Sequence, residues 1–377
     1  MTRTRDDDAC PGALQVHRAA DGLLARLRLP GGMIGAGQLE ALAHIAAEYG
    51  NGTLELTARG NLQLRGLRDA DAVSDAAAAA GLLPSPSHER VRNIVASPLS
   101  GRVGGLADVR PWVGALDSAI RTDVVLAALP GRFMFGLDDG TGDISGLHAD
   151  VGAHVLDERA ALLLAGQDTG VRLQPDEVVP ALLAVARRFV EVREKAWRIA
   201  ELDDPTDLVA GFEVTEPAGA TYPPARRVPV GWIPQDDGLV ALGAAVPLGV
   251  LSARQAEFVA AIEAPVVITP WRSLLVCDLA EGVADTSLRV LAPMGLVFDE
   301  NSRWLDVTAC VGSPGCEKSL ADVRAEATRA VSEDTAGGRV HYVGCERACG
   351  SPVSGTVLVA TEDGFRVRAE SGTWPGS

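Results

Sequence analysis

Two periodicities organise the apolar and polar positions of this 377-residue chain, and they predict both helices and strands. Apolar residues recur at helical spacing over 36–49 and again over 252–262, which predicts two amphipathic helices. In the second helix, Ser252 and Gln255 occupy the N-cap and capping-box positions. Each helix follows a strand and a turn rich in glycine and proline, and each precedes another strand. The pattern therefore predicts two strand–turn–helix–strand units.

The two units are copies of one internal repeat. The segment 21–25 (Asp-Gly-Leu-Leu-Ala) recurs at 237–241 as Asp-Gly-Leu-Val-Ala, and 56–62 aligns with 268–274. Single positions also recur at a constant spacing: Pro30, Gly32 and Gln38 correspond to Pro247, Gly249 and Gln255. Two half-units so far apart indicate one pseudo-symmetric sheet-and-helix domain that is assembled from distant parts of the chain.

The rest of the pattern predicts two α/β domains. The expected boundaries are an N-terminal tail at 1–14, half-repeat 1 at 15–80, the first α/β domain at 85–201, a linker at 202–224, half-repeat 2 at 225–285 and a last domain at 290–377. The first α/β domain is expected to hold strands at 124–127, 132–135 and 161–164 and a helix over 175–201. The last domain is expected to hold a helix over 317–331 and strands at 339–343 and 355–360. The fold class is therefore α+β.

One stretch of half-repeat 1 alternates strictly between polar and apolar side chains. Its polar members, which a continuous strand would present on one face, are Thr57, Arg59, Asn61, Gln63 and Arg65. Such a face can be a solvated sheet surface or a binding surface. The second repeat has Trp271, Leu275 and Cys277 at three of the equivalent positions, so the repeat architecture does not itself require polar residues there.

Charge and composition narrow the function classes. The formal net charge of −16 argues against nucleic acid as a partner, because lysine and arginine dominate binding to phosphates. No apolar run is long enough to span a membrane, and the N-terminus lacks the apolar region of a signal peptide, so we expect a cytoplasmic protein. Lysine occurs only at Lys195 and Lys318. Arginine clusters in this acidic chain are candidate carboxylate sites, although a coding bias that favours arginine explains their number equally well.

Four of the six cysteines form two close pairs near the end of the sequence. Cys310 and Cys316 are spaced C-x5-C, and Cys345 and Cys349 are spaced C-x3-C. Four thiolates suit zinc, copper(I) or an iron–sulfur cluster. Structural zinc sites usually space each pair by two to four residues, so the wider first pair favours a cluster; zinc, disulfides and unrelated thiols remain alternatives. Of the other two cysteines, Cys277 lies in an apolar run typical of a core thiol, and Cys10 lies outside both pairs.

The cysteine spacing resembles that of the nitrite/sulfite reductase superfamily, and the resemblance covers nearly the whole chain. It implies a ferredoxin-like repeat domain built from two distant halves and a last domain whose four cysteines hold a 4Fe–4S cluster. Within the superfamily the sequence is most similar to the precorrin-3B synthase family, the oxygen-dependent enzymes of cobalamin biosynthesis. The reductases have Cys-Pro-Asn-x-Cys in the second pair, whereas this chain has Cys345-Glu-Arg-Ala-Cys349.

The resemblance also implies a tetrapyrrole site. Thr-x-Arg-x-Asn-x-Gln at 57–63 is similar to a strand that contacts the macrocycle in the reductases, and Arg92 and Asn93 match a pair of pocket residues. The segment 129–135 matches one in which the reductases place two lysines near the bound anion, and this chain has Arg132 and Met134 there. The missing second cation counts against an anion reductase. The substrate-binding residues that we expect are Arg59, Asn61, Gln63, Arg65, Arg92, Asn93 and Arg132.

What the resemblance implies about activity is a monooxygenase reaction, the hydroxylation of precorrin-3A at C20 with formation of a γ-lactone. Its partners would be the tetrapyrrole, dioxygen and an external electron donor such as a ferredoxin or an NAD(P)H-dependent reductase, since the chain has no Gly-x-Gly-x-x-Gly fingerprint after a strand. A second iron centre is an open possibility. The alternatives are a sirohaem-dependent sulfite or nitrite reductase and, outside the enzymes, an iron–sulfur electron-transfer subunit.

Overall fold

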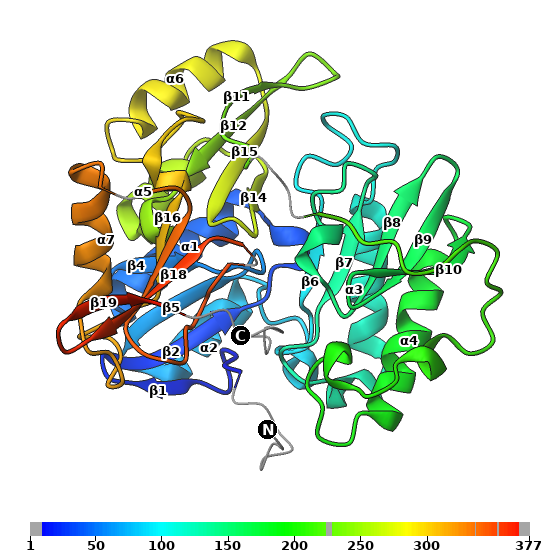
Figure 1. Cartoon of the computed structure of the whole chain (residues 1–377). Helices are drawn as coiled ribbons and strands as arrows, with labels where there is room; N and C mark the ends of the chain where they lie inside the picture. Colours follow the sequence, from blue (N-terminus) through cyan, green and yellow to red (C-terminus); the bar gives the residue numbers. More distant parts are fainter. Residues whose placement is uncertain (1–9, 224–227, 336, 353, 369–377) are drawn as a thin grey trace.

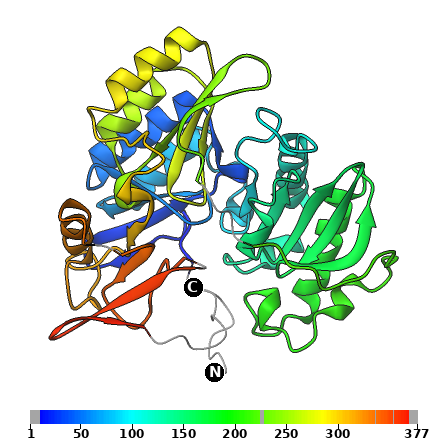
Figure 2. The same cartoon turned by 45° about the horizontal axis from the view of Figure 1, so that its top comes forward.

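The computed structural model describes residues 10–223, 228–335, 337–352 and 354–368. Parts of the expected tail, linker, half-repeat 2 and last domain thus lie outside the described residues. The molecule has an α+β architecture built around four sheets. Half-repeat 1, half-repeat 2 and the last domain lie together on one side, and the first α/β domain lies beside them (Figures 1 and 2).

The two half-repeats have the same order of elements. Half-repeat 1 consists of β1 (His17–Ala19), β2 (Gly22–Leu27), β3 (Met33–Ile34), α1 (Ala36–Tyr49), β4 (Thr53–Leu56), β5 (Leu62–Leu67) and α2 (Ala70–Ala79). Half-repeat 2 consists of β11 (Gly231–Pro234), β12 (Val240–Ala245), β13 (Val250–Ser252), α5 (Ala253–Ala260), β14 (Val266–Ile268), β15 (Ser273–Leu279) and α6 (Glu281–Leu291). Both predicted amphipathic helices are confirmed, and Ser252 and Gln255 form the expected capping box.

The two halves are joined because a short strand of each half pairs within the sheet of the other. The two sheets have the orders β1-β2-β5-β4-β13 and β11-β12-β15-β14-β3, so β13 and β3 each pair in the sheet of the opposite half. Leu251 lies opposite Leu54 and Val266 lies opposite Ile34. One continuous apolar core runs through both halves, and α1 packs against α5 within it. The distant halves therefore form one folded domain.

The predicted continuous strand from Thr57 to Arg65 is wrong. β4 ends at Leu56, a tight turn follows, and β5 begins at Leu62. The turn is closed by the Thr57 amide, which donates to the Asn61 carbonyl at 2.9 Å, and it contains Gly60 at φ +64°. Glycine reaches this left-handed conformation at little cost, so Gly60 reverses the chain and ends the alternation.

The first α/β domain is a five-stranded sheet in the order β10-β9-β8-β7-β6, with parallel β6, β7 and β8. Its elements are β6 (Ile94–Ala96), α3 (Arg110–Thr122), β7 (Phe135–Asp138), β8 (Val151–Leu156), β9 (Arg159–Leu164), β10 (Gln167–Leu173) and α4 (Val178–Val192). The strand expected at 161–164 is confirmed within β9. The strand expected at 124–127 is wrong, since a 3-10 turn forms at Leu126–Ala128, and the helix expected over 175–201 ends at Val192.

The segment expected as a linker packs against this domain. Within its described residues, Thr206–Val209 form a 3-10 turn, and single bridges join Val214 to Val171 and Thr221 to Gln167 of β10. The segment therefore runs along the edge strand, while Pro224 lies outside the described residues.

The last domain has the order β16-β17-β18-β19, with β16, β17 and β18 parallel. Its elements are β16 (Val307–Ala309), α7 (Val323–Ser332), β17 (Val340–Val343), β18 (Thr356–Thr361) and β19 (Gly364–Val367). The expected helix begins at Val323 rather than at residue 317, because the Asp322 side chain caps it by accepting from the Ala325 amide. Residues 317–322 instead belong to the loop that follows the first cysteine pair.

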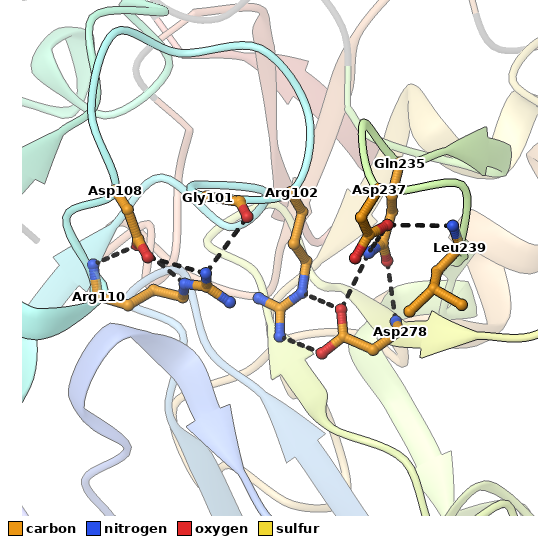
Figure 3. Close-up of polar contacts among 8 residues, drawn as sticks. All are labelled: Gly101, Arg102, Asp108, Arg110, Gln235, Asp237, Leu239 and Asp278. Atoms are coloured by element: carbon orange, nitrogen blue, oxygen red, sulfur yellow. Dashed lines mark hydrogen bonds and ion pairs between the residues drawn. The ribbon is translucent and has the colours of Figure 1, made fainter.

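An ion pair joins the first α/β domain to half-repeat 2. The Arg102 guanidinium donates to both carboxylate oxygens of Asp278 on β15, at 2.7 and 2.9 Å (Figure 3). Gln235 completes the contact, since its amide donates to the same carboxylate at 3.0 Å and its carbonyl accepts from the Asp278 backbone at 2.8 Å. No helix within the described residues is both long and apolar enough to cross a membrane.

Candidate functional site: the cysteine loops and an arginine cluster

Both cysteine pairs lie at one edge of the last sheet. Cys310 directly follows β16, and Cys345 follows β17 after a single glycine. Because β16 and β17 are parallel, their carboxyl ends meet at the same edge. Burial raises the pKa of the Cys349 thiol, and the nearby thiols of Cys310, Cys345 and Cys316 raise it further.

The geometry of the thiols bears on the kind of group they could hold. None of the cysteines forms a disulfide. Four thiolates around one zinc ion lie about 2.3 Å from the metal, which brings the sulfur atoms close together. Across the described residues, no three cysteine sulfur atoms come within 4.8 Å of one another. The donor set is four soft thiolate ligands, which suits an iron–sulfur cluster.

Glycines let the cysteine loops lie close to their surroundings. A Cβ on Gly344 would stand 1.8 Å from the Ser319 hydroxyl, and one on Gly312 would stand 2.7 Å from a Val323 methyl group. The Gly344 amide, which is free of such a Cβ, donates to the Cys310 sulfur at 3.4 Å. Backbone N–H groups aimed at sulfur stabilise thiolate charge, so the loops fit an anionic metal–sulfur centre.

Side chains from elsewhere in the fold hold the loops in place. Arg65 on β5 pairs with both oxygens of Asp21 and donates to the Gly315 carbonyl at 2.8 Å, beside Cys316. The buried His341 ring contacts the Cys349 carbonyl at 3.0 Å through Nε2 and the Thr308 hydroxyl at 2.8 Å through Nδ1. Burial, assisted by the charge of Arg272, lowers the pKa of His341 to about 3, so the ring is neutral. Nε2–H then donates to the carbonyl.

A cluster of guanidinium groups surrounds Arg59 in the β4–β5 turn. Burial and then the neighbouring charge of Arg198 lower the pKa of Arg59 to about 9, and Arg26 and Arg28 act in the same direction. Arg198 is neutralised by Asp150, at 2.6 Å. Among the residues that the structure describes, the Arg59 side chain makes no hydrogen bond or ion pair. The turn therefore presents an uncompensated cation.

Two further arginines of this cluster have unused donors. Arg28 is 2% exposed, and burial lowers its pKa to about 10. In the part of the chain that the structure describes, the Arg28 Nη1 atom and the buried Arg26 Nε atom have no hydrogen-bond partner. Both side chains donate to the Cys10 sulfur, at 3.3 and 3.4 Å. Buried unsatisfied donors are costly, so this cluster is suited to an anionic ligand.

The other polar residues expected on this face make internal contacts. Asn61 is 1% exposed, accepts from the Leu29 amide at 2.8 Å and donates to Asn93 at 3.2 Å. Gln63 accepts from Arg26 at 2.7 Å and donates to Glu55 at 2.9 Å. Asn61 and Gln63 thus lie near Arg26 and Arg59, but their hydrogen bonds hold neighbouring strands and side chains in place.

The expected residues of the first α/β domain have different surroundings. Arg92 is buried in an ion pair with Asp117 at 2.6 Å. The guanidinium of Arg132 lies 5.2 Å from the centre of the Trp197 ring. Met134, at the position where the resemblance implies a second cation, is buried in a small apolar cluster that also contains Val95 and is packed by Trp271 of half-repeat 2.

Several residues of the site were not expected from the sequence. They are Arg26, Arg28, Arg198, Arg272 and His341. The alternation Ala25-Arg26-Leu27-Arg28 is the same polar/apolar signal as that at 57–65, and it was present in the sequence. Arg198, Arg272 and His341 carry no such signal, because tertiary packing brings them to the site.

Comparisons with known proteins agree with this architecture. Residues 15–79 match the family model described as the nitrite/sulfite reductase ferredoxin-like half domain. A precorrin-3B synthase of a Sinorhizobium species is 28% identical, with 95% of this chain and 81% of that protein covered. These matches support the resemblance to the nitrite/sulfite reductase superfamily that the sequence indicates.

A nitrite reductase and a solved structure are also similar to this chain over most of its length. A ferredoxin–nitrite reductase of Synechococcus elongatus is 24% identical, over 87% of this chain and 74% of that enzyme. The structure of the NirA protein of Mycobacterium tuberculosis superposes with a TM-score of 0.74 at 20% identity, over 92% of this chain and 74% of that one. The nitrite/sulfite reductase-like fold expected from the sequence is therefore confirmed, and the relatives indicate an oxidoreductase.

Proposed function

We propose that this protein is an oxygen-dependent tetrapyrrole hydroxylase of the precorrin-3B synthase type. The observation that carries the proposal is the uncompensated cation at Arg59, within a cluster whose buried donors on Arg26 and Arg28 are unused. A cationic cluster of this kind suits an anion with several carboxylates, and precorrin-3A has acetate and propionate groups around its rim. The 28% identity to a precorrin-3B synthase supports the same assignment.

The proposed binding step uses guanidinium–carboxylate hydrogen bonds. Arg59, together with the unused donors of Arg26 and Arg28, would bind carboxylates on one edge of the macrocycle. Asn61 and Gln63 would act mainly by holding this framework, because their amides already have protein partners. Arg92, Asn93 and Arg132 would position the wall contributed by the first α/β domain.

The four cysteines would hold a 4Fe–4S cluster next to this pocket. When bound, the cluster supplies electrons one at a time. Hydroxylation balances if one oxygen atom of dioxygen enters the substrate at C20 and the other leaves as water, with two electrons and two protons from an external donor. That donor would be a ferredoxin or an NAD(P)H-dependent reductase. The ring A acetate carboxyl group would then close the γ-lactone by adding its oxygen to the ring carbon next to C20. Its proton would end on the oxygen introduced at C20, so the product gains one oxygen atom overall.

Two observations separate this proposal from its alternatives. Met134 lies in an apolar cluster against which Trp271 packs, at the position where a reductase would place a cation for its small anion, and this favours the hydroxylase over a sulfite or nitrite reductase. An electron-transfer subunit needs no tetrapyrrole site. The ion pair of Arg92 would suit such a subunit, but an Arg59 side chain with no partner among the described residues would not.

The test is one anaerobic preparation measured in two ways. The absorption spectrum should show the broad band of an iron–sulfur cluster without the intense bands of sirohaem. The same protein should bind precorrin-3A. Sirohaem in the isolated protein would favour the reductase, and a cluster without tetrapyrrole affinity would favour the electron-transfer subunit.

A further inference from the structure

The turn that joins β14 to β15 contains an arginine in an unusual backbone conformation. Arg272 has φ +59°, and it aligns in the repeat with Gly60, which has φ +64°. The two turns are closed alike, since the Thr269 amide donates to the Ser273 carbonyl at 2.9 Å, as Thr57 does to Asn61. Side chains beyond glycine reach this conformation only at an energetic cost. Half-repeat 2 thus has a strained arginine at the position where half-repeat 1 has a glycine.

The Arg272 side chain extends to both cysteine loops of the last domain. Its Nη1 atom donates to the Ala309 carbonyl at 3.2 Å, and Ala309 directly precedes Cys310. Its Nη2 atom donates to the Gly350 carbonyl at 3.3 Å, and Gly350 directly follows Cys349. A single planar guanidinium therefore joins a residue next to the first cysteine pair to a residue next to the second. The ammonium group of a lysine cannot make both contacts with the same geometry.

Among the residues that the structure describes, no ion pair neutralises the charge of Arg272. Burial lowers the pKa of Arg272, and the charge of the Glu55 carboxylate opposes this shift. The Glu55 side chain is itself occupied by Arg324 and Gln63. Within the described residues, no carboxylate lies within ion-pair distance of Arg272. A half-buried positive charge beside thiolates stabilises added negative charge, which is what reduction of a metal–sulfur centre creates.

We infer that Arg272 is a positioning residue of half-repeat 2 that fixes the two cysteine loops relative to each other and raises the reduction potential of the centre they hold. The inference rests on the proposed iron–sulfur cluster. Beyond that proposal, Arg272 aligns the two cysteine loops, and its charge raises the reduction potential of the cluster.

The test compares Arg272→Gln, which removes the charge, with Arg272→Lys, which keeps the charge but not the two-armed contact. In anaerobic redox titrations monitored by electron paramagnetic resonance, the Gln variant should show a more negative midpoint potential, and the Lys variant should stay near the parent value. Both variants should lose iron to a chelator several-fold faster than the parent. Arg102→Gln, at a buried arginine that also joins two domains, is the matched control and should behave as the parent does.

The outcomes separate the inference from the proposed function. A parent protein without iron and sulfide would contradict the cluster itself. A parent with a full cluster, and a Gln variant with an unchanged potential, would overturn only the role of Arg272. If the Gln variant cannot be loaded with a cluster, the Lys variant tests the inference. Faster iron loss at a midpoint potential like that of the parent supports it, and iron loss at the rate of the parent overturns it. Absence of iron from both variants would show a requirement in folding and would also overturn it.

Discussion

Asn61 in half-repeat 1 donates a hydrogen bond from Nδ2 to Oδ1 of Asn93 in the first α/β domain, at 3.2 Å, and both side chains are 1% exposed. The amide of Asn93 in turn donates to the Arg90, Gly131 and Phe133 carbonyls. These two amides therefore link the repeat domain to the α/β domain at the base of the arginine cluster.

Replacing Asn93 with alanine should destabilise the fold. The change removes the acceptor of Asn61 Nδ2 and the side-chain donor to the Gly131 and Phe133 carbonyls. A buried unsatisfied group costs about 1–3 kcal/mol. We expect a loss of at least that size in the free energy of unfolding, measured by urea denaturation. Asn301→Ala, at an exposed position with only local contacts, is the control and should change stability by less than about 0.5 kcal/mol. Equal stability of the two variants would contradict the linking role.

Serine at any one of the four paired cysteines should abolish or greatly reduce bound iron and sulfide. The reason is that each thiolate occupies one corner of the proposed site. Iron and sulfide analysis of Cys310→Ser, Cys316→Ser, Cys345→Ser and Cys349→Ser tests this. The control is Cys277→Ala, since Cys277 is fully buried in an apolar cluster and burial raises its pKa to about 11. A full complement of iron in Cys345→Ser would show that the ligand assignment is wrong.

Arg59→Ala should weaken tetrapyrrole binding about ten- to a hundred-fold, because a hydrogen bond to a charged group contributes about 1.5–3 kcal/mol. It should not lower stability, since the side chain has no partner among the described residues and gives up an unfavourable buried charge. Equilibrium titration of the substrate and thermal unfolding measure the two effects. Arg254→Ala, on the exposed face of α5, should leave binding unchanged. Unfolding of Arg59→Ala with unchanged affinity would indicate a structural role instead.

Asp143 should make stability depend on pH. Burial, opposed by a hydrogen bond from Ser97, raises its pKa to about 7, against about 3.9 in an unfolded chain. The folded protein therefore binds this proton more tightly than the unfolded chain does, and the contribution of Asp143 to stability falls as pH rises from about 4 to above 7. Asp143→Asn should remove this decline and raise the melting temperature most at pH 8. A parallel pH profile for the variant and the parent would refute the prediction.

The repeat could be predicted from the sequence because it depends on local signals. Glycines in left-handed turns, the Ser252 cap and helical spacing over 36–49 act within a few residues, and each predicts the element that the structure contains. The exchange of β3 and β13 between the halves could not be predicted, since it depends on pairing across some 200 residues.

The site was predicted unevenly for the same reason. Cysteine spacing predicted two loops that together offer four thiolates, whereas their place at one sheet edge comes from the structure. The alternation at 57–65 suggested a strand where Gly60 makes a turn. An alternating pattern cannot distinguish a strand from a hairpin when the turn residue falls in phase with it. The partners of Arg92 and Arg65, which are Asp117 and Asp21, also depend on tertiary packing.

The central claim is that this protein adds oxygen to a tetrapyrrole bound beside an iron–sulfur centre. The most direct measurement is mass spectrometry of precorrin-3A after incubation with the cluster-loaded protein, a reductant and isotopically labelled dioxygen. The account predicts a product heavier by one oxygen atom that carries the label, and about ten- to a hundred-fold less of it with Arg59→Ala at a limiting substrate concentration. Unchanged precorrin-3A from a protein that instead reduces sulfite or nitrite would contradict it.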